Sequence, residues 1–276
     1  MTKYGYTSLI AVALGFGVAT QSNAQVAPTR VTAAGSRALA KALDLIQNHY
    51  GVEISYEDAE YTFGGDLMDV TDLGWWKQHP DDPRRSLTPR GGSLSIEFPP
   101  SFNGDRLSSA FSAVARMLSA HDLQQLPGRF RLVQDGATLF VVPREVRNTA
   151  GVWVAATSPL DSSVDIRRQD WNALKLVQEI ADQISKRTGR EVGLGNVPMN
   201  FLMNQHVELE AHGEPARQVL TRLFREGNWR VPAAPLPRQD IMWRLYYSPG
   251  GRNYALNLDA PPGPPQDDSK WLTKQE

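Results

Sequence analysis

The stretch SRALAKALDLIQNHYGVEISYED, residues 36–58, decides the fold because the chain echoes it in DWNALKLVQEIADQISKRTGREVGLGN, residues 170–196. In both stretches apolar residues recur every three or four positions, which places them on one face of a helix. These residues are Leu39, Leu43, Ile46 and Tyr50 in the first stretch and Leu174, Val177, Ala181 and Ile184 in the second. A pattern that occurs twice predicts a structural unit that is built twice.

The ends of both helices carry recognisable signals. Ser36 and Asp170 are the expected N-terminal caps, because their side chains can accept hydrogen bonds from the first free amides. Gly51 and Gly189 are expected to end the helices in the left-handed conformation. A short strand is expected after each glycine, over residues 52–56 and residues 191–194.

Each copy continues with an alternating strand and a second amphipathic helix. The first copy has SLSIEF and RLSSAFSAVARML, and the second has HVELEA and PARQVLTRLF. Period-two alternation predicts a strand with one buried face. Each copy then ends in an expected β-hairpin, with turns at Asp135-Gly136 and at Pro249-Gly250-Gly251. A further strand is expected before each first helix, over residues 29–33 and 163–166.

The sequence therefore predicts an α+β fold made of two β-α-β-β-α-β-β modules. In each module two helices would cover one face of a small, mostly antiparallel sheet. The expected boundaries are a first module over residues 25–145 with a long insertion at 57–92, a linker at 146–169 that includes a strand at 151–157, a second module over 170–260, and a proline-rich mobile tail at 261–276.

Residues 1–24 have the pattern of a secretory signal: Lys3, an apolar stretch too short to span a bilayer comfortably, and small residues at 22–24. The alternative is an uncleaved membrane anchor. The chain has no cysteine, which excludes disulfides and thiolate sites, and its formal net charge is −1. The sequence has no excess of basic residues that would suggest a nucleic-acid partner. It also has no polybasic cluster that would suggest binding to an anionic membrane surface. We expect an exported protein, periplasmic if the source is a Gram-negative bacterium, with no stable membrane span after cleavage.

The order of elements resembles the secretin and TonB short N-terminal (STN) domain, a small periplasmic module. The residues that carry the resemblance are ALDLIQNHYGVEISY, VQEIADQISKRTGREVGL and the element QVLTRLFREGNW at 218–229. The resemblance implies contact with other envelope proteins and offers no catalytic residue. The sequence departs from a secretin because no pore, plug or outer-membrane barrel can follow residue 260, and the insertion at 57–92 has no counterpart in the second copy.

Trp75 and Trp76 lie near the centre of that insertion. A long loop in a compact domain is usually functional or disordered, and paired tryptophans could stack on a sugar or fill a partner's pocket. The alternative is that both rings fold back over the sheet or the helix faces. Asp66, Asp69 and Asp72 lack the alternating oxygen ligands, the glycine and the terminal glutamate of a calcium loop.

The strongest chemical pattern is formed by alternate residues of one expected strand: His206, Glu208, Glu210 and His212. Imidazoles and carboxylates suit a divalent metal ion. On a straight strand, however, the two histidines would lie ~20 Å apart, far beyond the bonds of one shared ion. We therefore expect a solvated strand face, and at most a His–Glu pair completed by a neighbouring strand could bind metal.

The sequence has no nucleophile elbow, no zincin motif and no P-loop, so no catalytic residue and no cofactor are predicted. Three functions stay open. The first is a non-enzymatic protein–protein interaction module of the cell envelope. The second is a small-ligand or glycan-binding protein that uses Trp75 and Trp76, and the third is a metal-binding protein or hydrolase at the strand from His206 to His212.

Overall fold

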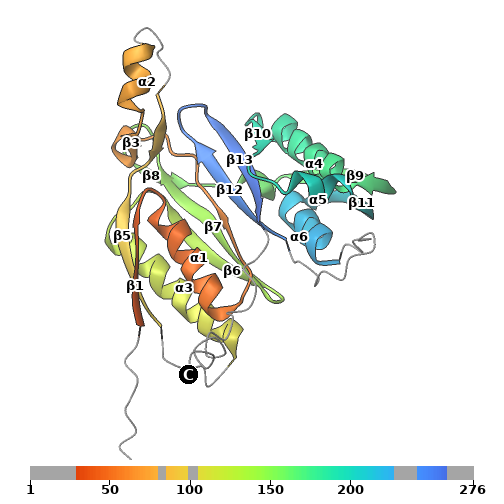
Figure 1. Cartoon of the computed structure of the whole chain (residues 1–276), viewed down its shortest axis with the longest axis horizontal. Helices are drawn as coiled ribbons and strands as arrows, with labels where there is room; N and C mark the ends of the chain where they lie inside the picture. Colours follow the sequence, from red (N-terminus) through yellow and green to blue (C-terminus); the bar gives the residue numbers. More distant parts are fainter. Residues whose placement is uncertain (1–28, 80–84, 99–104, 227–240, 260–276) are drawn as a thin grey trace, which may run out of the picture.

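The structure, a computed structural model, describes residues 29–79, 85–98, 105–226 and 241–259 (Figure 1). The expected signal at 1–24 and the expected tail at 261–276 lie outside these residues. The described chain has an α+β fold with mixed and antiparallel sheets. None of its described helices has both the length and the apolar character needed to cross a bilayer.

The first unit, as we call the elements β1 to β8, begins with β1 (Thr29–Gly35), α1 (Ala38–Tyr50) and β2 (Ile54–Glu57). The insertion follows, with a 3-10 turn at Gly64–Asp66, β3 (Leu67–Asp69), α2 (Leu73–Gln78) and β4 (Leu87–Pro89). The unit continues with β5 (Gly92–Phe98), α3 (Arg106–Leu123), β6 (Arg129–Asp135), β7 (Thr138–Arg147) and β8 (Trp153–Ala155).

The second unit comprises the elements from β9 to β13. After a 3-10 turn at Pro159–Asp161 it has β9 (Ser163–Asn172), α4 (Ala173–Thr188), β10 (Val192–Leu194) and α5 (Met199–Met203). It then has β11 (His206–Pro215), α6 (Ala216–Glu226), β12 (Met242–Ser248) and β13 (Asn253–Asp259).

One seven-stranded sheet joins the two units. Its strand order is β10-β13-β12-β2-β7-β6, and β8 pairs with the end of β7. β2 runs parallel to β7 and β10 runs parallel to β13, whereas the hairpins β6–β7 and β12–β13 are antiparallel, as their turn sequences predicted. Three two-stranded pairs, β1–β5, β9–β11 and β3–β4, stand apart from this sheet.

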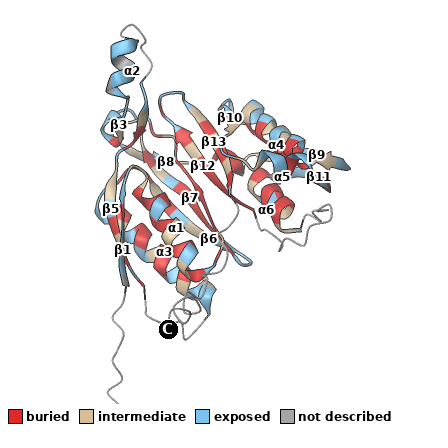
Figure 2. Ribbon diagram, viewed as in Figure 1, coloured by how far each residue is buried: buried red, intermediate tan, exposed pale blue. Residues whose placement is uncertain are grey.

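The helices α1, α3, α4 and α6 lie between sheets, which differs from the expectation that the helices cover one face of a single sheet. α1 and α3 pack between the β1–β5 pair and one face of the large sheet, and we call this the first core. α4 and α6 pack between the β9–β11 pair and the large sheet, and this is the second core. The side chains that form the two cores are buried (Figure 2). The alternating sequences of β5 and β11 predicted that one face of each strand is buried, but alternation does not indicate which strands share a sheet.

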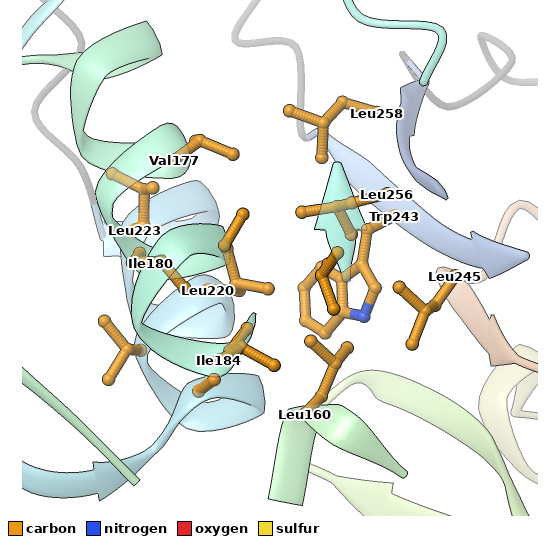
Figure 3. Close-up of a cluster of buried hydrophobic side chains, with 14 of the residues drawn as sticks. Leu160, Val177, Ile180, Ile184, Leu220, Leu223, Trp243, Leu245, Leu256 and Leu258 are labelled. Carbon is orange, nitrogen blue, oxygen red and sulfur yellow. The ribbon is translucent and has the colours of Figure 1, made fainter. Parts of the chain in front are cut away.

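The alternation of β7 shows that the two cores lie on opposite faces of the large sheet. Leu139 and Val141 belong to the first core, whereas Phe140 and Val142 belong to the second. Figure 3 shows the second core, where Trp243 of β12 lies among leucine and isoleucine side chains from α4, α6 and β13.

The two expected glycine stops are confirmed. Gly51 (φ 63°) and Gly189 (φ 67°) are left-handed, and their amides donate to the carbonyls of Gln47 and Ser185, each four residues earlier. The side chains of the same two residues then accept from the amides that begin the next strands, Ile54 at 3.2 Å and Val192 at 2.9 Å. In each unit, one residue of the last helical turn thus accepts hydrogen bonds from two amides: its carbonyl bonds the glycine that ends the helix, and its side chain bonds the start of the next strand.

The two expected N-terminal caps are wrong. α1 begins after Arg37, which is itself left-handed (φ 52°) and makes no capping side-chain bond. The cap of α4 is Asn172, which accepts from the Lys175 amide at 3.2 Å, while Asp170 lies within β9. β9 pairs with β11 as far as Asn172, so the strand extends six residues beyond the expected 163–166 and the helix cap lies two residues later than expected.

The junction of the two units is a parallel pairing of β12 with β2. Arg244 lies opposite Tyr56, and the Asp58 amide donates to the Leu245 carbonyl at 2.8 Å. Glu57 of β2 has no exposed side-chain surface and accepts from Nε and Nη2 of Arg217 on α6 at 2.6 and 2.7 Å. A third guanidinium nitrogen of Arg217 donates to Asp161 at 2.6 Å.

We expect Glu57→Gln to lower the free energy of unfolding by about 3 kcal/mol, because it leaves a mostly buried guanidinium short of its main counter-charge. Denaturant unfolding at neutral pH measures this loss. The matched control is Arg168→Gln, which breaks the exposed pair with Glu208 and should leave stability unchanged. Equal effects of the two substitutions would contradict the structural role of the Glu57–Arg217 pair.

Candidate interaction surface

The insertion between β2 and β5 forms an arm. Its stalk is the antiparallel pair β3–β4, and α2 lies at its outer end, beyond the seven-stranded sheet (Figure 1). Trp75 and Trp76 belong to α2, and their side chains lie outside the described part of the structure. The structure therefore puts the helix that carries both tryptophans far from α1 and α3, whose faces it was alternatively expected to cover.

The stalk presents apolar and polar groups to solvent. Met68 and Val70 are 40% and 47% exposed. Asp69 accepts from the Thr71 amide at 2.9 Å and from Arg85 at 3.0 Å, and the Ser86 amide donates to the Thr71 hydroxyl at 2.8 Å. These polar contacts join the two sides of the stalk. The stalk also contacts the body, because the backbone carbonyl of Arg85 lies against Gly250 in the turn between β12 and β13.

Asp58 anchors the base of the arm on the side of β2. Its carboxylate is fully buried and accepts from the hydroxyls of Tyr56 at 2.6 Å and Tyr61 at 3.1 Å, and from the Tyr247 amide at 3.0 Å. Burial, reinforced by the charge of Asp58, raises the pKa of both tyrosines well above the ordinary value, so both donate as neutral phenols.

Arg37 supplies the counter-charge of Asp58. Its Nε donates to Asp58 at 2.8 Å, and its other nitrogens donate to the hydroxyl of Thr88 at 3.4 Å and to the Tyr247 carbonyl at 2.5 Å. Burial by itself would lower the pKa of Arg37, but the charge and hydrogen bond of Asp58 leave it raised. The left-handed conformation of Arg37 is held by these bonds, which tie α1, both ends of the insertion and β12 together.

A second buried carboxylate, Asp66, anchors the start of the stalk. It has no exposed side-chain surface, and Nε and Nη2 of Arg147 at the end of β7 donate to its two oxygens, the former at 3.0 Å. The Arg147 guanidinium also lies over the rings of Phe63 and Trp153, 5.2 and 5.1 Å from their centroids, and Arg129 lies over Trp153 at 4.2 Å. This stack holds β8 and the arm to the edge of β7.

His121 lies near the same base, at the end of α3. Its ring packs edge-on against Phe130, and its Nδ1 is buried with no hydrogen-bond partner among the described residues. Burial lowers the pKa of His121 to about 4, so the imidazole is neutral at physiological pH. A cavity of about 10 Å³ separates it from Arg37 and Tyr61, which is enough for one water molecule at most.

The four alternate residues of β11 lie on a solvated face. His206 contacts Asp170 of β9 at 3.2 Å, and His212 contacts Glu210 at 2.6 Å. Glu208 pairs with Arg168 instead of turning toward a histidine. In the described chain no three His, Asp or Glu side chains are grouped so that they could hold a metal ion.

Comparison of the chain with protein-family models, with curated proteins and with solved structures found no match. The site is therefore defined by its own geometry. The sequence pattern indicated the insertion and its tryptophans, and it drew notice to Asp66 only as one of three aspartates that lack a calcium pattern, but it did not indicate the anchoring roles of Asp58 and Asp66. Their partners, Arg37 and Arg147, are 21 and 81 residues away along the chain, and in the sequence each acid resembles an ordinary loop residue.

We expect Asp66→Asn to release the arm, because an amide facing the Arg147 guanidinium replaces a paired carboxylate. Limited proteolysis read by mass spectrometry should show cleavage between residues 67 and 90 accelerated about tenfold or more, as expected for a local opening. Glu208→Gln, which breaks the exposed pair with Arg168 in the second unit, is the control and should leave the rate unchanged. Equal rates for both variants would contradict the anchoring role of Asp66.

We expect His121 to make the protein less stable in acid. Its pKa is about 4 in the folded chain and about 6.5 when unfolded, so the unfolded state takes up the proton first. Its contribution is complete above pH ~6.5 and declines as the pH falls toward ~4, by about 3 kcal/mol in total. Chemical unfolding across this range should show that His121→Leu removes this part of the pH dependence and that His212→Leu, on the exposed strand, does not.

Proposed function

We propose that the chain consists of two STN-like modules that share one sheet. The element order supports this proposal: β1-α1-β2-β5-α3-β6-β7 in the first unit corresponds to β9-α4-β10-β11-α6-β12-β13 in the second. The pairings correspond as well, since β1–β5 matches β9–β11 and the parallel pair β2–β7 matches β10–β13. The equivalent roles of Gln47 and Ser185 add a match in local detail.

The arrangement of the units supports the same proposal. Along the sheet, β10-β13-β12 is followed by β2-β7-β6, so the corresponding strands keep their order but run in opposite directions. The cores lie on opposite faces. The strand order is unchanged, the strand directions are reversed and the faces are exchanged. These relations describe a half-turn about an axis in the sheet, perpendicular to the strands, combined with a shift of three strands along that axis. The strand β12 thereby lies at the inner border of the second unit's part of the sheet and pairs with β2 of the first unit.

We further propose that the protein is an exported, non-enzymatic interaction module of the cell envelope, periplasmic where the source is a Gram-negative bacterium. The observation that carries this proposal is the arm: two buried carboxylates fix its base, while its stalk exposes Met68 and Val70 and its outer helix carries Trp75 and Trp76. A rigidly anchored projection with apolar and aromatic residues is suited to contact with another protein. The signal-like pattern of residues 1–24 supports export.

The second candidate is a small-ligand or glycan-binding protein that uses the same arm. The outward position of α2 favours it, since two neighbouring tryptophans on a projecting helix could stack on a ring. The metal-binding reading of the strand from His206 to His212 receives less support, because its side chains already pair with Asp170, Glu210 and Arg168.

The test replaces Lys77, an exposed residue of α2, with a photo-crosslinking amino acid in intact cells. We expect specific envelope proteins to crosslink from this position and not from Lys175 on the exposed side of α4. Trp75→Ala combined with Trp76→Ala should abolish the crosslinks without lowering the Tm. If Lys77 yields no protein product but the double substitution abolishes binding to a glycan array, the second candidate replaces the first.

A further inference from the structure

Strand β5 has an open edge. Within the described residues β5 pairs only with β1, in a two-stranded sheet on the outer side of α1 and α3. The Nε2 of Gln124 donates to the Ser93 carbonyl at 2.9 Å, so this carbonyl points away from β1. In an antiparallel pair the amide and carbonyl of alternate residues point the same way, so those of Ser95 and Glu97 also face away from β1.

The open edge borders a groove against α3. The groove has a volume of about 210 Å³ and is lined by Ser95, Ile96 and Glu97 of β5, by Ala113, Arg116 and Met117 of α3, and by Arg30 of β1. Enclosed sites for small molecules usually measure about 300–1,000 Å³, so this smaller groove suits a segment that lies along it. An edge strand beside a helix offers backbone hydrogen bonds on one side and side-chain contacts on the other.

The charges of the groove favour an acidic ligand. Arg30 and Arg116 are both exposed and form no ion pair with a described residue, and Arg30 lies opposite Glu97 in the register of β1 and β5. Two arginines against one glutamate leave an excess of positive charge. A peptide with an aspartate or glutamate would satisfy that excess.

The second unit closes the corresponding edge. There, β11 lies beside α6 as β5 lies beside α3. Arg222 of α6 donates to the Glu210 carbonyl of β11 at 2.6 Å and to the carboxylate of Glu214, also at 2.6 Å. Arg222 of α6 therefore uses one hydrogen-bonding group on the edge of β11, and its charge is already paired with Glu214. In the first unit Gln124 takes only the Ser93 carbonyl at the start of the edge, and Arg116 lines the groove beside Ser95 and Glu97 without such a bond. Among the described residues, the edge of β5 at Ser95 and Glu97 therefore stays accessible.

We infer that the groove between β5 and α3 binds an extended, acidic peptide segment of a partner protein, which adds a third strand to the β1–β5 pair. The backbone of Ser95 and Glu97 holds the segment, and Arg30 and Arg116 select for its carboxylates. This inference rests on the proposed interaction function and names a second contact surface, separate from the arm.

The test selects short random peptides displayed on phage against the full mature protein. Recovered sequences should be enriched in aspartate and glutamate and should alternate as strands do. Synthetic copies should bind the Ser95→Pro variant about tenfold more weakly or worse, since proline removes an edge amide that makes no bond to β1 and obstructs an added strand. Ser95→Ala, which loses the same hydroxyl contact to Thr32 but keeps the amide, should bind as the unchanged protein does.

Arg116→Glu provides a second variant that leaves β5 untouched. It should weaken the same peptides by about tenfold or more, while Arg131→Glu on the exposed part of β6 should not. Binding that Ser95→Pro and Arg116→Glu leave unchanged, or a selection that returns no peptide above the Ser95→Pro background, would overturn the inference. Crosslinking from Lys77 that persists in Ser95→Pro would at the same time uphold the interaction function.

Discussion

The rest of the structure depends on the position of β2. All four of its residues are buried, and it is paired on both edges, with β7 on one side and β12 on the other. Ile54 and Tyr56 point into the first core, while Glu57 on the opposite face meets Arg217 of the second unit. A short strand with no exposed face cannot move without opening both cores. This constraint fixes the two units as one body with one continuous sheet.

Ion pairs of buried carboxylates hold together segments that lie far apart in the chain. Glu57, Asp58 and Asp66 have no exposed side-chain surface, and each is paired with an arginine from a different part of the chain. A buried charge is costly unless it is paired and fully hydrogen-bonded, so each carboxylate tolerates only one arrangement of the surrounding segments. One pair fixes the units to each other and two fix the arm to the body. The same chemistry therefore determines both the overall architecture and the rigidity of the projecting surface.

Both surfaces that we propose to contact partners lie in the first unit. The arm and the edge of β5 both belong to it, whereas in the second unit the short helix α5 occupies the place of the arm in the element order and Arg222 occupies an edge position on β11. The second unit also covers one face of the shared sheet with α4 and α6. We therefore propose a division of labour, in which the second unit supports a first unit that carries the contacts with partners.

The sequence by itself determined the local elements. The stripe of Leu39, Leu43 and Ile46, the glycine stops and the hairpin turns predicted helices and hairpins that the structure contains, because these signals act within a few residues. The sequence also located the insertion and its tryptophans. Only the tertiary structure decided that the helices lie between sheets, that β12 pairs with β2, and that Asp58 and Asp66 anchor the arm. Each of these depends on groups that lie far apart in the chain, and no periodicity or spacing records which strand or which arginine a residue will meet.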